Sequence, residues 1–175
     1  MTLLLSYSRY LKRFFLSLFG KDHFINPDCD LDYSINIYEY GAWPIVHNFF
    51  KSPPKIYSFG VGDNISWDLN ALFYYKSNIY AYDPTPRCAE WIDKQDLPDE
   101  FNFNKIGISN HNGEESFVVP QNNKHVSFKK NILDDYDSIS FQVNTLDVLM
   151  KKNSHQEIDI LKLDIEGFEY SVIKD

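Results

Sequence analysis

The chain has 175 residues and a formal net charge of −8 at pH 7, with 17 Lys and Arg against 25 Asp and Glu. This length suits one compact domain, and 43% hydrophobic with 24% charged residues excludes a disordered or collagen-like chain. The negative charge argues against a general nucleic-acid binder, which needs a cationic face to neutralise phosphates. Two cysteines, Cys29 and Cys88, are too few for a disulfide framework, so we expect a reducing, cytoplasmic compartment.

The first 20 residues have the pattern of an amphipathic helix. Their apolar residues recur at spacings of three and four, and Arg9 and Arg13 fall on the opposite face. A bilayer span needs about 20 mostly apolar residues, and the cations inside this stretch argue against one. Two interpretations stay open, of which we favour the first. Either the helix covers the core of the domain, or residues 1–20 make a peripheral contact with an anionic membrane surface.

From the N-terminus onward, we expect a helical extension over residues 1–50 and a second region over residues 51–175. Residues 20–34 are polar and read as a loop, whereas residues 35–50 read as two short pieces. Strands are expected at 55–60, 78–83, 101–109 and 158–165. Helices are expected at 65–75, 86–94 and 143–152, and a further one begins at Gly167. A meander of short strands is expected at 111–120, 126–130 and 139–143. Asp63 or Asn64 is expected to cap the first of these helices, and Asn144 or Thr145 the third. This alternation implies a mostly parallel α/β sheet with right-handed crossovers.

Two glycines lie in the first turn from strand to helix. Gly60 and Gly62 allow a sharp turn and a close approach of a ligand to the backbone. Asp83 ends the next predicted strand, where a carboxylate can accept both hydroxyls of a ribose. Ile65 stands where a dinucleotide fingerprint requires its third glycine, so the pattern favours a smaller adenosine ligand over NAD.

A pair of carboxylates, Asp164 and Glu166, follows the last predicted strand. Because the carboxyl ends of strands in an open α/β sheet face the ligand crevice, these residues are candidates for a general base, a hydroxyl-orienting group or a hard-cation site. The alternative is a solvated strand end whose acids favour the following helix N-terminus. His47, His111 and His125 are other candidate bases, and no His/Cys cluster has the spacing of a metal site, so none is expected.

The segments IYSFGVGDNISWDLN, YAYDPTPRCAEWI and DILKLDIEGFEYSVI resemble the FkbM family of S-adenosylmethionine-dependent methyltransferases. The resemblance extends from Lys55 to Asp175. It implies an α/β fold, the Rossmann-like class I methyltransferase fold, preceded here by the N-terminal amphipathic helix. It also implies S-adenosylmethionine as cofactor and O-methylation of a hydroxyl on a sugar, a glycan or a small metabolite.

Carried over by position, the resemblance places Gly60 and Gly62 beside the methionine part of the cofactor and Asp83 on its ribose. Ile106, Gly107 and Ile108 would lie near the adenine, and Asp164 and Glu166 would face the methyl-transfer cleft as the catalytic residues. Two positions depart from the family pattern. Ser58 replaces an acid that commonly lies two residues before the first glycine, and Asn64 replaces the last glycine of the loop. Cofactor binding would then depend more on Asp63, Asp83 and backbone groups.

Sheets of this family normally continue with three strands past the fourth one. We therefore expect a C-terminally truncated domain whose last strand is an exposed edge, with weak cofactor binding and low solubility. The alternatives are a non-catalytic remnant that acts as a binding or assembly module, and an NAD or nucleotide-sugar enzyme with the same first half. The sequence indicates neither the oligomeric state nor the identity of the acceptor.

Overall fold

The computed structural model describes residues 11–21, 31–34, 43–118, 129–130, 138–165 and 167–173. The chain divides into two compact units, residues 1–32 and 33–175. In the first unit, residues 11–18 are helical, as the sequence predicts for that stretch, and side chains on its apolar stripe, including Phe15 and Leu18, are exposed. None of the helices in the described residues is long and apolar enough to cross a membrane. Core packing and membrane contact both stay open predictions for this helix.

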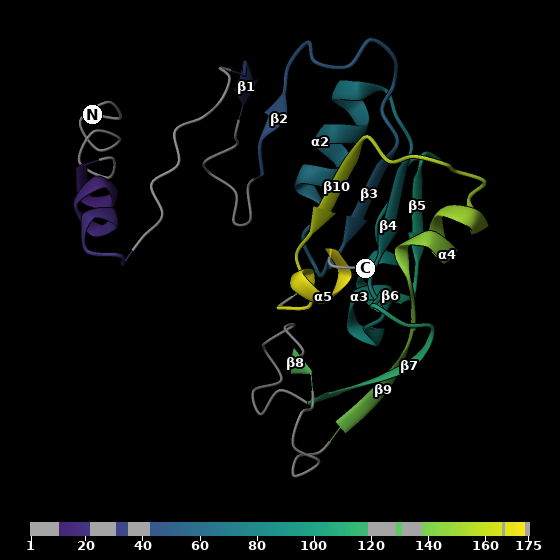
Figure 1. Cartoon of the computed structure of the whole chain (residues 1–175). Coiled ribbons are helices and arrows are strands. Elements are labelled where there is room, and N and C mark those ends of the chain that lie inside the picture. Colours follow the sequence, from purple (N-terminus) through teal and green to yellow (C-terminus); the bar gives the residue numbers. More distant parts are fainter. Residues whose placement is uncertain are drawn as a thin grey trace. The chain divides into compact units, whose positions relative to one another are not determined.

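A four-stranded parallel sheet forms the centre of the second unit (Figure 1). Its order is β10 (Ile160–Leu163), β3 (Ile56–Phe59), β4 (Ile79–Tyr82) and β5 (Phe101–Asn104). The prediction of a parallel sheet is therefore confirmed. Within the described part of the chain, β10 pairs with β3 alone and is the edge of this sheet.

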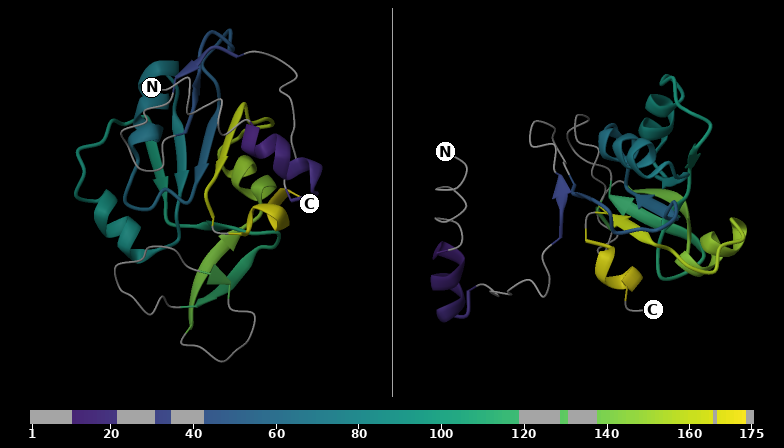
Figure 2. Two further views of the ribbon diagram at one scale, coloured as in Figure 1. Left: turned by 90° about the vertical axis from the view of Figure 1, so that its left-hand side faces the viewer. Right: turned by 90° about the horizontal axis from the view of Figure 1, so that it is seen from above.

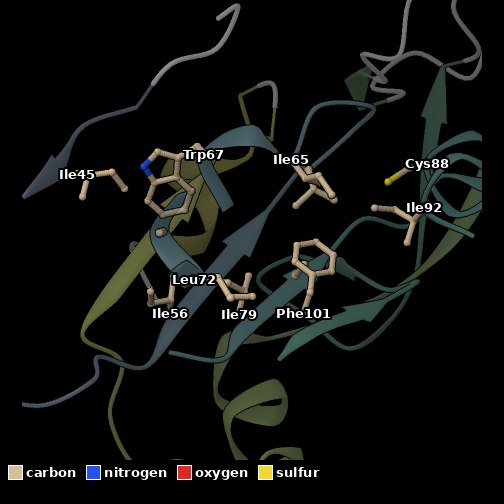
Figure 3. Packing of buried hydrophobic residues seen from close by; sticks show 12 residues of the cluster. Ile45, Ile56, Ile65, Trp67, Leu72, Ile79, Cys88, Ile92 and Phe101 are labelled. Carbon is tan, nitrogen blue, oxygen red and sulfur yellow. The ribbon is translucent and has the colours of Figure 1, made fainter. Parts of the chain in front are cut away.

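Alternate residues of these strands face two separate hydrophobic layers. On one face, Ile56 and Ile79 pack with Leu72 of α2 (Ser66–Tyr75) and with Ile92 of α3 (Pro86–Ile92), and Figure 3 shows this packing. On the other face, the layer consists of aromatic residues and residues from α4 (Leu146–Lys152) and α5 (Glu169–Ile173). Because the sheet is covered on both faces, its central strands β3 and β4 consist almost entirely of aliphatic and aromatic residues, whereas β5 alternates Phe and Asn.

The aromatic layer also contains a hydrogen-bonded core. The Asn153 amide donates to the hydroxyl of Tyr57 at 2.9 Å and to that of Tyr82 at 2.8 Å. The rings of Phe59 and Tyr82 stack with their centroids 4.8 Å apart. Burial raises the pKa of Tyr82 to about 12, still further above neutral pH than the ordinary tyrosine value. The network supplies the partners that buried tyrosine hydroxyls need.

A second sheet lies beyond the carboxyl ends of the central strands (Figures 1 and 2). Its order is β6 (Gly107–Ile108), β9 (Ser138–Asn144), β7 (Gly113–Val118) and β8 (Lys129–Lys130). The predicted meander is wrong in its order, because the antiparallel strand β7 lies between β8 and β9. The long pairing of six residues between β7 and β9 outweighs the two-residue pairing with β8.

The predicted strand 101–109 is also wrong as a single strand. The Ile106 N–H donates to the Asn104 carbonyl at 2.9 Å, which turns the chain and divides the stretch into β5 and β6. Two short strands, β1 (Tyr33–Ser34) and β2 (Ile45–Val46), form an antiparallel pair. Residues 33–34 therefore do not belong to the predicted loop. Helix α4 begins at Leu146 rather than near Val143, because residues 143–144 extend β9.

Candidate functional site

The turn after β3, residues 60–65, is called the glycine loop below. Gly60 and Gly62 have φ angles of 75° and 58°, in the left-handed region that favours glycine. The Gly60 N–H donates to the Tyr82 carbonyl at 2.9 Å, which holds the start of the loop against the end of β4. A Cβ atom at Gly60 would collide with the backbone carbonyl of Asp164. The loop therefore requires glycine at position 60 for two independent reasons.

Asp83 connects the glycine loop to the next helix. Its Oδ2 accepts a hydrogen bond from the Gly62 N–H at 3.0 Å. Its Oδ1 accepts from the Thr85 N–H at 2.9 Å and from the Thr85 hydroxyl at 2.6 Å. The residue is 5% exposed. Because a carboxylate has about four acceptor positions, these three bonds take up most of its acceptor capacity.

Helix α3 begins directly behind Asp83. Thr85 is its N-cap, and its hydroxyl accepts from the Cys88 N–H at 3.4 Å, while Pro86 occupies the first turn where no N–H is needed. On the exposed side, Arg87 of this helix forms an ion pair with Asp63 of the glycine loop at 3.4 Å. Exposed pairs of this kind contribute little stability. Asp63 therefore lies at the rim of the loop, within reach of solvent.

Asp164 follows β10, and Asp83 follows β4. Because β10 and β4 flank β3, the two aspartates lie on opposite sides of the glycine loop, which follows β3. The Asp164 N–H donates to the Phe59 carbonyl at 3.0 Å, and the Asp164 side chain is exposed. Glu166, its predicted partner, lies outside the described residues. Glu169 accepts a hydrogen bond from the Ile165 N–H at 3.1 Å and closes the turn that leads to α5. Asp164 is thus an exposed carboxylate fixed through its backbone beside Gly60.

Ile106 and Gly107 follow β5, the other neighbour of β4. Gly107 is buried, and a Cβ atom there would lie 3.0 Å from Val143 and 3.3 Å from Pro84, the residue after Asp83. Ile106 is partly buried and packs against the aromatic layer. Close packing on Pro84 therefore explains the glycine at position 107 without a ligand.

A family model matches the part of the chain that contains the glycine loop, Asp83 and Asp164. The family model described as the methyltransferase FkbM domain matches residues 58–175, which is more than half of the chain. The chain belongs to the FkbM methyltransferase family. No curated protein and no solved structure matches the chain significantly.

In this FkbM domain, the parallel strands bring four of the predicted site residues, Gly60, Gly62, Asp83 and Asp164, to the carboxyl end of the sheet. Gly60 contacts the backbone of Asp164, and Gly62 is bonded to Asp83, so these four residues form one connected group. Their roles toward cofactor and substrate stay predictions. Among the residues that the structure describes, no group of three or more His, Cys, Asp or Glu could hold a metal ion.

The histidines proposed as alternative bases occupy other places. His47 is hydrogen-bonded to Ser34 at 2.9 Å, between the two short strands β1 and β2. His111 contacts Ser109 at 3.2 Å in the turn before β7. His125 lies outside the described residues. Burial, followed by the charge of Asp83, raises the pKa of the Cys88 thiol, which supports the interpretation of Cys88 as a packing residue rather than a nucleophile.

The sequence analysis overlooked two buried charges beside the glycine loop, Asp68 in the first turn of α2 and Lys162 in β10. They are 0% and 6% exposed. Burial raises the pKa of the Asp68 carboxyl, and the Lys162 ammonium and the Ser58 hydroxyl counteract this in part. A signal was present, because Asp68 follows Ile65 by three residues and precedes Leu72 by four, and so lies on the apolar stripe of its helix.

Proposed function

We propose that this FkbM domain transfers a methyl group from S-adenosylmethionine to a hydroxyl of a sugar, a glycan or a small metabolite. The single observation that carries the proposal is the hydrogen bond between the Gly62 N–H and the Asp83 carboxylate, 3.0 Å long. It holds the glycine loop and the acid together at the carboxyl ends of β3 and β4. Ligands of open α/β sheets bind at that edge.

The residues present fit the cofactor in two respects. Gly60 and Gly62 turn the backbone sharply in the left-handed region at the carboxyl end of β3, where ligands of such sheets bind. Asp83 Oδ2 keeps acceptor capacity for a ribose hydroxyl beside its bond to Gly62. The glycine loop would lie against the methionine part, Asp83 would hold the ribose of the adenosine, and Ile106 would lie near the adenine. Ile65 still disfavours a dinucleotide, because it replaces the third glycine of that fingerprint, which allows the helix to pack closely on the strand.

The chemistry asks little of the protein beyond positioning and proton removal. S-adenosylmethionine supplies a methyl group that is already electrophilic because it is bonded to a positively charged sulfur. Asp164, exposed beside Gly60, accepts the proton of the acceptor hydroxyl. The oxygen of that hydroxyl forms the new bond to the methyl carbon at the same time. In that transfer the carbon–sulfur bond would break with its electron pair on sulfur, so S-adenosylhomocysteine would be the second product. The fixed backbone of Asp164 and Gly60 supplies the alignment that such a displacement requires.

Replacement of Asp83 by Asn is expected to weaken the binding of S-adenosylhomocysteine by about 10- to 100-fold. The change removes a charged acceptor, whose hydrogen bonds contribute about 1.5–3 kcal/mol, and about 1.4 kcal/mol corresponds to each tenfold in affinity. Isothermal titration calorimetry on wild type and variant measures the change. Asp93→Asn, an exposed aspartate at the end of α3, is the matched control and should bind as wild type does.

The same titration separates the competing functions. Wild type should bind S-adenosylhomocysteine and not NAD or a nucleotide sugar. Binding of NAD or of a nucleotide sugar in its place would contradict the proposal. A panel of sugars and small hydroxylated metabolites, assayed with methyl-labelled S-adenosylmethionine, then tests transfer itself. Cofactor binding without transfer to any acceptor would favour the non-catalytic binding module.

A further inference from the structure

The two buried charges beside the glycine loop have no role in the proposed chemistry. Neither oxygen of Asp68 accepts a hydrogen bond of ordinary geometry from any residue that the structure describes. A fully buried carboxylate without compensation costs several kcal/mol, so its retention needs a reason. The positive charge of Lys162 favours the ionised form of Asp68 and counteracts the rise of its pKa.

Lys162 contacts side chains from β3, from α2 and from the segment before β2. It lies opposite Ser58 in the register of β10 and β3, and its Nζ donates to the Ser58 hydroxyl at 3.4 Å. The same Nζ lies 5.9 Å from the ring centroid of Trp67, the neighbour of Asp68 in α2, and 5.8 Å from that of Trp43. The ammonium is therefore directed to the α2 side of the sheet, where Asp68 is buried.

We propose that Asp68 and Lys162 act as a buried charge pair that fixes the first turn of α2 to the end of β10. Through these two elements the pair positions the glycine loop and Asp164 relative to each other. Asp68 lies three residues after the end of the glycine loop, and Lys162 precedes Asp164 by two residues. Where the two segments meet, the Asp164 N–H is bonded to the Phe59 carbonyl and the Asp164 carbonyl abuts Gly60. Asp68 and Lys162 are thus positioning residues.

A double-mutant cycle tests the pair without any ligand. Asp68→Asn and Lys162→Met each leave one buried charge uncompensated, and each should lower Tm by roughly 6 °C or more. The double variant D68N/K162M removes both charges and should have a Tm above that of either single variant. Asp147→Asn is the control, because the ion pair between Asp147 and Lys151, 2.7 Å long, is exposed to solvent. This substitution should change Tm by less than about 2 °C. Additive losses in the cycle would overturn the pair.

Relocation of the carboxylate gives a second, independent cycle. Because Ser58 touches the Lys162 ammonium, Ser58→Asp should raise Tm when Asp68 is already Asn. In the wild-type background it should lower Tm, because two buried carboxylates would then share one cation. An equal effect of Ser58→Asp in both backgrounds would contradict the pair.

The positioning role rests on the proposed function and has its own readout. At 10 °C, below the Tm of each folded variant, D68N should bind S-adenosylhomocysteine at least about fivefold more weakly than wild type, and S58D/D68N should recover part of the loss. If the Tm cycles show coupling between Asp68 and Lys162 but D68N binds S-adenosylhomocysteine as tightly as wild type, the pair stabilises the fold only. That result would overturn its positioning role. A wild-type chain that binds no S-adenosylhomocysteine, while the Tm cycle still shows coupling, would instead contradict the proposed function.

Discussion

Gly60→Ala is expected to abolish cofactor binding and to lower Tm by more than about 5 °C. An L-residue in the left-handed region costs about 1–2 kcal/mol, and the φ angle of Gly60 is 75°. The added Cβ would also collide with the Asp164 carbonyl, a backbone atom that cannot rotate away. Relief of that collision must move the glycine loop or the end of β10, and each kcal/mol lost lowers Tm by about 2–4 °C for a chain of this size.

Differential scanning fluorimetry with and without S-adenosylhomocysteine measures both effects in Gly60→Ala. Gly20→Ala is a matched control for backbone strain, because Gly20 has a similar φ of 65° and open space around its Cα. The control should keep the ligand-dependent rise in Tm. If Gly60→Ala had a wild-type Tm and a wild-type response to the ligand, the close approach of the glycine loop to Asp164 would be wrong.

Asp164→Asn is expected to lower kcat by about 100- to 10,000-fold, which is the range for loss of a general base. The amide keeps the size and the backbone bond to Phe59 but cannot take the proton of the acceptor hydroxyl. Affinity for S-adenosylhomocysteine should change by less than about threefold, because this side chain acts on the acceptor. A large loss of kcat with an almost unchanged affinity for the ligand identifies a group that acts in the transition state.

Asp159→Asn supplies the control for Asp164, since Asp159 lies at the other end of the same strand. Its carboxylate accepts from the Lys55 N–H at 2.7 Å at the amino ends of β10 and β3, whereas the glycine loop follows the carboxyl end of β3. This variant should keep kcat within about twofold once it is folded. Wild-type turnover in Asp164→Asn would exclude Asp164 as the base and return attention to the histidines or to Glu166.

The central sheet could be predicted because each strand carries its own local signal. The apolar runs that became β3, β4 and β10 are bounded by glycine, proline or aspartate, and helical patterns separate the first two. The loop between Asn104 and Gly107 has no sequence signal of this kind. Neither Lys105 nor Ile106 is a turn residue by type, so a tertiary effect, the pairing of Gly107 with Val143, divides that strand.

The candidate site was predicted in part for a related reason. Strand ends and glycines place Gly60, Gly62, Asp83 and Asp164 at one edge from sequence order alone. What the sequence could not supply is the direction of a side chain. Asp83 uses most of its acceptor capacity on Gly62 and Thr85, and Asp68 and Lys162 compensate each other across two elements. Such pairings depend on register and on helix rotation, which periodicity leaves undetermined.

Nuclear magnetic resonance of the chain labelled with ¹⁵N-glycine tests the central claim most directly. The chain has 7 glycines, so the spectrum is simple enough to follow each amide during titration with S-adenosylhomocysteine. The amides of Gly60 and Gly62 should shift most, that of Gly107 less, and that of Gly20 should stay in place. Saturation with the ligand that left Gly60 and Gly62 unmoved would show that no adenosine moiety rests on this loop.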